Sequence, residues 1–151
     1  MNILLISLPE KNKDMKLEAT EVLPLALYSL SSVLKCQGYE VSIIDPCEFV
    51  YLDEKENAET TCVTLIEECL EEGYDIVGFS VNTFNWGITK TVVNQISWKK
   101  NTTVVLGGLH VSVFDEYSLL TTKADIIMRG EGELSLQNVF SKKFTLFATF
   151  R

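Results

Sequence analysis

The sequence predicts one α/β domain built on an open, parallel β-sheet. Short apolar runs typical of strands alternate with amphipathic helical stretches along almost the whole chain. Three of these runs lead directly into loops of small and polar residues, at Ser80–Thr83, Gly107–His110 and Arg129–Glu133. Because parallel strands end at one edge of their sheet, where ligands bind, the three loops predict one shared site.

The first strand and the first helix open this alternation. Residues 2–7 form a continuous apolar run, which is expected for a strand covered on both faces. A helix is predicted from Leu23 to Gln37, because Pro24 suits a first turn and Gly38 suits a helix end. Its apolar stripe comprises Ala26, Leu27, Leu30, Val33 and Leu34.

The second strand, from Glu40 to Asp45, alternates more and stops before Pro46, which indicates an edge position. Residues 46–57 hold several charges and are predicted to form a loop or linker. The clearest amphipathic helix runs from Ala58 to Glu72. Its stripe comprises Cys62, Leu65, Ile66, Cys69 and Leu70, and its solvated face comprises Glu67, Glu68, Glu71 and Glu72.

The second half of the chain continues the pattern. Strands are expected at residues 75–80, 102–106 and 125–128, and helices at residues 85–99, 115–120 and 132–140. Ile88, Val92 and Ile96 should face inward from the first of these helices. The tail, residues 141–151, departs from the alternation, which leaves three interpretations open. It extends the last helix, covers a sheet edge, or begins a further domain.

Length and charge exclude several classes of protein. The 151 residues leave room for one domain, and the hydrophobic share of 46% is enough for a proper core. The formal charge of −8 argues against a nucleic-acid or anionic-membrane surface, since both require clustered Lys and Arg. Apolar runs are too short to span a membrane, and the N-terminus lacks a signal-peptide pattern. We therefore expect a cytoplasmic protein.

The metal-binding and nucleotide-binding patterns tested are missing from the sequence. The four cysteines fit neither a zinc site nor a CxxC redox motif, and one histidine cannot supply a multi-His zinc site. The first loop, Ser7–Glu10, has no GxGxxG fingerprint and no Walker pattern. Binding of a nicotinamide cofactor in the usual manner and nucleotide hydrolysis are therefore disfavoured.

Each candidate loop has a structural and a functional interpretation. Gly107 and Gly108 suit a tight turn or the close approach of a bulky ligand. His110 fits, in descending order, a structural residue, a donor to a ligand or a metal ligand. Ser80 and Thr83 suit helix capping or a ligand, and both roles can coexist.

The last loop is less easily explained by capping. Gly130 and Gly132 flank an acidic residue and permit an unusual backbone path. Arg129 is positioned in the sequence to pair with Glu131 or Glu133.

In this order and spacing, the motifs resemble the N-terminal cobalamin-binding domain of cobalamin-dependent radical S-adenosylmethionine enzymes. The resemblance covers residues 1–140. It rests on the segments Asn2–Pro9, Pro24–Val41, Asp75–Ser80, Val104–His110 and Ile127–Glu133.

The resemblance implies a doubly wound, five-stranded parallel sheet of the flavodoxin-like (Rossmann-like) type. A corrinoid would lie over the carboxyl edge, with its nucleotide tail between the loops after strands one, three and four. Ser80 and Thr83 would bond the tail, Gly107 and Gly108 would let it pass, and Leu109 and His110 would border it. The implied cobalamin-binding set is Ser7, Leu8, Pro9, Ser80, Val81, Asn82, Thr83, Gly107, Gly108, Leu109, His110, Arg129, Gly130, Glu131 and Gly132.

Three departures from the family pattern shape the expected function. Leu109 stands where the family often has Pro, and the first loop lacks the Asp-x-His-x-x-Gly segment that supplies a lower cobalt ligand. No CxxxCxxC motif is present, so no iron–sulfur cluster is expected in this chain. We expect a cobalamin-binding module, either a carrier or a fragment of a methyltransferase-type enzyme, that works beside a radical S-adenosylmethionine catalytic domain or protein.

Two alternatives stay open at this point. One is a relic of the fold that binds no corrinoid and acts as a protein-interaction domain. The other is a flavodoxin-like enzyme acting on a small molecule, although no nucleophile–base pair in the sequence supports it.

Overall fold

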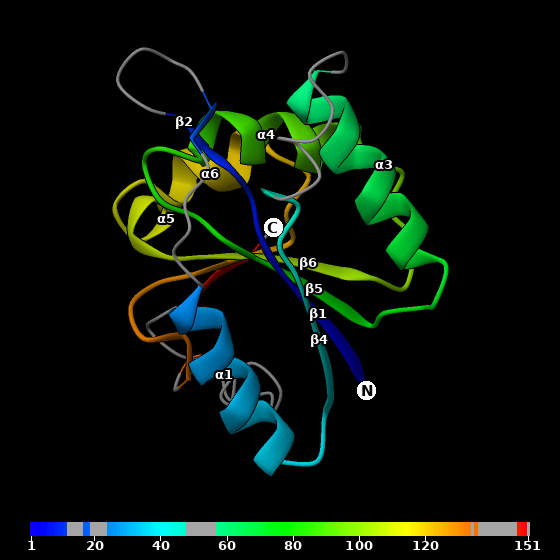
Figure 1. The fold of residues 1–151 in the computed structure, drawn as a ribbon. Helices are drawn as coiled ribbons and strands as arrows, with labels where there is room; N and C mark the ends of the chain where they lie inside the picture. Colours follow the sequence, from blue (N-terminus) through cyan, green and yellow to red (C-terminus); the bar gives the residue numbers. More distant parts are fainter. Residues whose placement is uncertain (12–16, 19–23, 48–56, 134, 136–147, 151) are drawn as a thin grey trace.

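The fold is a single open sheet with helices on both faces, seen in a computed structural model (Figure 1). The structure describes residues 1–11, 17–18, 24–47, 57–133, 135 and 148–150. Five strands are mutually parallel: β1 (Asn2–Ser7), β4 (Glu40–Ile44), β5 (Ile76–Ser80), β6 (Thr103–Gly107) and β7 (Ile126–Met128). The described helices are α1 (Leu25–Cys36), α3 (Ala58–Leu70), α4 (Trp86–Gln95), α5 (Leu109–Val113) and α6 (Asp115–Thr121).

The strand order confirms the predicted fold class. The sheet runs β4-β1-β5-β6-β7-β8, so the chain winds outward in both directions from β1 and β5. The prediction that the second strand lies at an edge is confirmed, because β4 ends the sheet. No helix among the described residues is long and apolar enough to cross a membrane.

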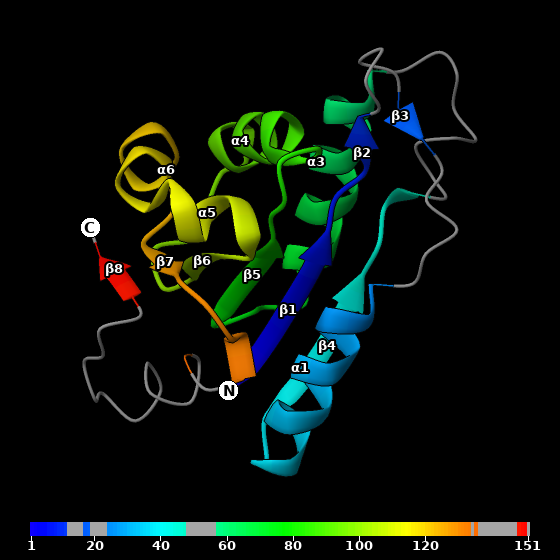
Figure 2. The same cartoon turned by 90° about the vertical axis from the view of Figure 1, so that its left-hand side faces the viewer.

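Two apolar layers form because strand side chains alternate between the faces. On one face, Leu4, Ile6 and Val77 pack with the buried sides of α3, α4, α5 and α6. On the other face, Ile3, Leu5 and Ile76 pack with α1, where Leu27 and Leu34 are buried. Figure 2 shows α1 on the side of the sheet opposite α3, α4, α5 and α6. Among the five helices given above, four therefore cover one face and α1 covers the other.

The first helix buries a slightly different stripe from the predicted one. Leu27, Ser31 and Leu34 face the sheet, whereas Ala26 is exposed and Leu30 and Val33 are half-buried. The predicted start at Leu23 lies outside the described residues.

The third described helix is shorter than predicted. α4 stops at Gln95, because Ile96 turns to extended backbone with φ −59° and ψ 139°. The indole Nε1 of Trp98 donates to the Val93 carbonyl at 2.9 Å, which satisfies a carbonyl at the helix end. Ile88, Val92 and Ile96 face inward as predicted.

α3 matches its predicted pattern closely. Cys62 is fully buried on the stripe, and the four glutamates of the opposite face are exposed. Burial, with the nearby charges of Glu59 and Asp45, raises the pKa of the Cys62 thiol to about 12. The thiol is thus a neutral core group, as expected for a cysteine that acts as a small hydrophobe.

Two features were not predicted, and one of the three interpretations of the tail applies to its described residues. A two-stranded antiparallel sheet, β2 (Glu10–Lys11) with β3 (Leu17–Glu18), follows the carboxyl end of β1 (Figure 2). α5 occupies residues expected to be a loop. In the tail, β8 (Ala148–Phe150) pairs antiparallel with β7, so these three residues cover a sheet edge. Residues 48–56, 136–140 and 141–147, where a loop, most of a helix and the rest of the tail were predicted, lie outside the described residues.

Candidate functional site

The carboxyl ends of four parallel strands form one row across the sheet. Ser7 pairs with Ser80, Ser80 with Gly107, and Gly107 with Met128. The loops singled out from the sequence leave from this row, so the fold brings them to a single edge. The predicted meeting of the loops therefore follows from the strand register.

A hollow lies beside this row, on the face covered by α1. Leu5, Gly78 and Val105 form the next row on that face, so Gly78 and Gly107 lie on neighbouring strands with no side chain toward α1. A cavity of about 210 Å³ occupies this space; we call it the α1 cavity. The sheet, α1 and the segment after β7 all contribute to its lining.

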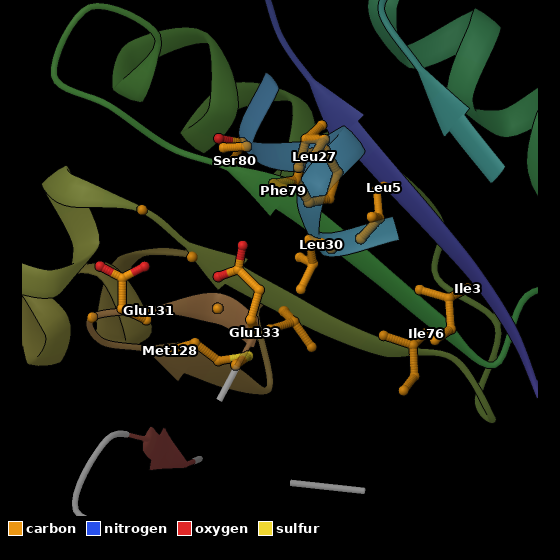
Figure 3. Close-up of a pocket in the computed structure, with 17 residues that line it drawn as sticks. Ile3, Leu5, Leu27, Leu30, Ile76, Phe79, Ser80, Met128, Glu131 and Glu133 are labelled. Carbon is orange, nitrogen blue, oxygen red and sulfur yellow. The ribbon is translucent and has the colours of Figure 1, made fainter. Parts of the chain in front are cut away.

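The α1 cavity is polar at one end and apolar at the other. Figure 3 shows the oxygens of Ser80, Glu131 and Glu133 at one end and the side chains of Ile3 and Ile76 at the other. The polar end coincides with the carboxyl edge, since Ser80 ends β5. The apolar end reaches under α1 toward the starts of β1 and β5.

Six of the predicted site residues line the α1 cavity: Ser80, Gly107, Gly108, Gly130, Glu131 and Gly132. Gly78 also lines it and was missed. Its position in the middle of an apolar strand was an available signal, because Gly inside a strand often marks a close approach. The role of all these residues in binding a cofactor stays a prediction.

Gly108 allows the loop after β6 to pack closely against the loop after β5. Its φ of 114° is in the left-handed region, and an added Cβ would lie 2.4 Å from the Val81 carbonyl oxygen. The same loops are joined by backbone hydrogen bonds from Val81 to Gly107 and from His110 to Val81. Both an unfavourable φ and a backbone clash therefore oppose any larger residue at position 108. At Gly107 an added Cβ would only touch Met128 at 3.9 Å.

Asn82 and Asn85 bind the loop after β5 to the loop after β1. Asn82 accepts from the Phe84 and Asn85 amides and donates to Glu10. The buried Asn85 side chain accepts from the Asn82 amide at 2.8 Å and donates to the Leu8 and Ser80 carbonyls. The side chain that accepts from the backbone amides just before α4 is therefore that of Asn82, and not that of Ser80 or Thr83. Asn85 was not identified from the sequence.

The other predicted site residues in the loops after β1, β5 and β6 do not line the α1 cavity. Leu8 and Pro9 are buried, Ser7 is half-buried, and Thr83 and Leu109 are exposed; none of them lines it. Arg129 forms an ion pair with Asp115 of α6 at 3.3 Å, instead of the expected pair with Glu131 or Glu133. This pair ties the loop after β7 to the helices of the opposite face.

His110 lies in an aromatic cluster on the face opposite α1. Its ring stacks on Trp86 with centroids 4.7 Å apart and contacts Phe114 at 5.1 Å. The side chain is 9% exposed, and within the described part of the chain neither ring nitrogen has a hydrogen-bond partner. Desolvation by this burial lowers the pKa of His110 from its ordinary value of 6.5. The imidazole is therefore neutral near pH 7, in keeping with the structural interpretation ranked first.

Metal ligands do not gather in the described residues. No group of three or more His, Cys, Asp or Glu side chains among them is arranged to hold a metal ion. Loops that meet at the carboxyl edge, beside a cavity with an apolar end, favour binding of a large, partly apolar organic ligand.

Comparison with known proteins identifies similar domains. The family model for the B12 binding domain matches residues 19–140. Two solved structures of TsrM, a radical S-adenosylmethionine methyltransferase from Kitasatospora setae, resemble the chain with TM-scores of 0.65 and 0.64. The first contains tryptophan substrate and a S-adenosylmethionine analogue, and the second contains cobalamin and a [4Fe-4S] cluster.

Sequence identity to these structures is 19% and 20%, a level at which the likeness shows a shared fold. The matches cover 95% of this chain but only 26% and 25% of the two solved chains. This chain thus spans about a quarter of the length of the methyltransferase. A comparison with curated proteins finds no match.

Replacing Asn85 with Ala should destabilise the fold by about 1–3 kcal/mol, because buried carbonyl groups of two loops lose their donor. Urea unfolding followed by circular dichroism would measure the loss. Asn101→Ala, at an exposed turn, is the matched control and should change stability by less than about 0.5 kcal/mol. Equal losses in the two variants would contradict the assigned role of Asn85.

The stability of the protein should depend on His110 below neutral pH. Because the folded pKa is lowered, the unfolded chain binds the proton more readily, so stability present above pH 6.5 is lost as the pH falls. Unfolding free energies measured from about pH 7.5 to about 5.5 should show this loss, with a slope of at most about 1.4 kcal/mol per pH unit from one group. His110→Phe keeps an aromatic ring and should flatten the profile; an unchanged slope would show that His110 is not the group responsible.

Proposed function

Because this chain belongs to the B12-binding domain family, we propose that it is a cobalamin-binding module whose α1 cavity receives the nucleotide tail of the corrinoid. The observation that carries the proposal is the hollow made by Gly78 and Gly107 at the carboxyl edge of the sheet. The corrin ring would then lie over the row of strand ends, next to the loops that follow β1, β5 and β6.

The shape and chemistry of the α1 cavity fit such a tail. The tail ends in a flat aromatic base, and the apolar end of the cavity offers aliphatic side chains such as Ile3, Leu30 and Ile76. A Cβ at position 107 would project into the hollow and meet only Met128, so Gly107 keeps open a space that a side chain could fill. These residues would hold the tail by apolar contact and shape.

When bound, the corrinoid would supply the methyl-transfer or radical chemistry, and this chain would bind and orient it. The first loop offers Ser7, Leu8, Pro9 and Glu10, so no imidazole comes from there. His110 packs against Trp86 on the opposite face from the α1 cavity. We therefore propose that no histidine of this chain is a cobalt ligand.

We also propose that the module works beside a catalytic domain of the radical S-adenosylmethionine type. The domain fold makes up only about a quarter of the similar methyltransferase chains. α5 and α6 carry apolar side chains on their exposed side, with Leu109 at 74% and Leu120 at 79% exposure. Val113, Phe114 and Tyr117, on the same two helices and at their junction, are also exposed, and exposed apolar side chains in one region are typical of a contact surface.

The same exposed surface supports the second candidate, a protein-interaction domain that binds no corrinoid. The α1 cavity argues for the first candidate, since contact with another protein along α5 and α6 does not require it. Retention of cobalamin separates the two.

Incubation with hydroxocobalamin and desalting should leave the protein coloured. At a ligand concentration of about a hundred times the dissociation constant, binding should add about 2.7 kcal/mol of stability. For a domain of this size the melting temperature should rise by roughly 5–10 °C. Loss of all colour, with no thermal shift, would favour the interaction domain.

The placement in the α1 cavity can be tested with Gly107→Val, which fills the hollow without the backbone clash expected at Gly108. The folded variant should lose both the colour and the thermal shift. Gly87→Val, on α4 and away from the cavity, is the matched control and should retain both, because an added side chain meets open space there. Full binding by Gly107→Val would refute the placement.

The isolated chain should not catalyse methyl transfer or cleavage of S-adenosylmethionine. The sequence holds no cysteine triplet for a cluster, and a corrinoid on an open sheet edge would be exposed to water on its upper face. Purified protein with methylcobalamin, S-adenosylmethionine and a strong reductant should match a no-protein control by product chromatography. Product that scales with the amount of this chain alone would refute its description as a carrier module.

A further inference from the structure

The polar end of the α1 cavity carries two carboxylates, Glu131 and Glu133, and the Ser80 hydroxyl lies on the same side of the cavity (Figure 3). We propose that these two carboxylates accept hydrogen bonds from the ribose hydroxyls of the corrinoid's nucleotide tail. The inference rests on the proposed function and deepens it, because it assigns the orientation of the tail and the part of the ligand that the site selects.

The backbone after β7 brings both carboxylates to the cavity. Gly130 has a φ of 73°, in the left-handed region, and an added Cβ at Gly132 would contact Leu30 of α1 at 3.6 Å. This path lays the segment against α1, and both acidic side chains line the cavity from there. The two glycines around the acid, noted in the sequence, therefore position the acids at the cavity.

Glu133 is already oriented by a neighbour on the other wall. The Ser29 hydroxyl of α1 donates to Glu133 Oε1 at 2.8 Å. A carboxylate has two oxygens and about four acceptor positions, so one serine donor leaves acceptor capacity for a ligand. The bond from α1 holds the carboxylate in place before a ligand arrives.

The polar and apolar ends of the α1 cavity favour different parts of the nucleotide tail. A carboxylate only accepts hydrogen bonds and repels a phosphate, so the polar end suits neutral hydroxyl donors. Ribose carries such hydroxyls and is attached directly to the aromatic base. With the base at the apolar end, among residues such as Ile3 and Ile76, the ribose falls at the end that holds Glu131 and Glu133.

The proposal predicts a selective loss of affinity. The double variant Glu131→Gln with Glu133→Gln removes both charges and keeps similar shapes. It should bind hydroxocobalamin about 10-fold more weakly, because hydrogen bonds to charged acceptors are the stronger ones. Binding of dicyanocobinamide, which keeps the ring amides but lacks the phosphate, the ribose and the base, should be the same in variant and unaltered protein. Absorbance titrations measure both affinities.

Two controls separate ligand contact from other effects. Ser29→Ala breaks the tie between α1 and Glu133 without removing the carboxylate, so it should cost much less affinity than the double variant. Glu68→Gln with Glu71→Gln removes the same charge from the exposed side of α3 and should leave the affinity unchanged.

The outcomes distinguish this inference from the proposed function. If the unaltered protein does not bind hydroxocobalamin, the proposed function itself fails. If it binds and the Glu131/Glu133 double variant binds equally well, only the assignment of the carboxylates fails. An equal loss for cobinamide would overturn the ribose assignment in favour of the ring amides, and an equal loss in Ser29→Ala would show that Glu133 acts only by holding α1.

Discussion

The proposed ligand site depends on two positions of the sheet that carry no side chain toward α1. Gly78 and Gly107 lie on adjacent strands, and both line the cavity beside this helix. The cavity has a volume of about 210 Å³. An added Cβ would meet the Leu5 side chain at 3.2 Å at Gly78 but only Met128, at 3.9 Å, at Gly107, so Gly107 is the position where a side chain would enter the space more freely.

The side chains near the strand ends have different surroundings on the two faces of the sheet. On the face of α3 to α6, the loops are fixed by internal contacts: Asn85 joins the first and third loops, and His110 stacks on Trp86. The Asn85 side chain is hydrogen-bonded within the protein, and the His110 ring is held by aromatic packing alone among the described residues. On the α1 face, Glu131 and Glu133 line open space and retain capacity for a ligand. The contacts on the first face tie the loops at the strand ends together, and the α1 face is where we propose that the corrinoid binds.

The fold could be predicted from the sequence because alternation and strand register depend on local patterns that a single chain displays. Individual contacts could not. Whether Arg129 pairs with Asp115 or with a nearer glutamate depends on where α6 packs. The bond by which Trp98 satisfies a carbonyl at the end of α4 is likewise not revealed by periodicity. The sequence indicated that Gly108 needs to be glycine. The physical cause is the Val81 backbone, which lies beside Gly108 only in the folded protein. Gly78 stands within an apolar strand run, and its place in the wall of the α1 cavity depends on where α1 packs.

The central claim is that the cofactor's tail enters between α1 and the sheet, and methyl NMR spectra during a hydroxocobalamin titration test it most directly. Ile3 and Ile76 line the α1 cavity, whereas Ile88 and Ile96 are buried on the opposite face. The account predicts that the methyl signals of Ile3 and Ile76 shift strongly on binding while those of Ile88 and Ile96 stay almost in place. Binding that leaves the Ile3 and Ile76 signals unmoved would contradict it.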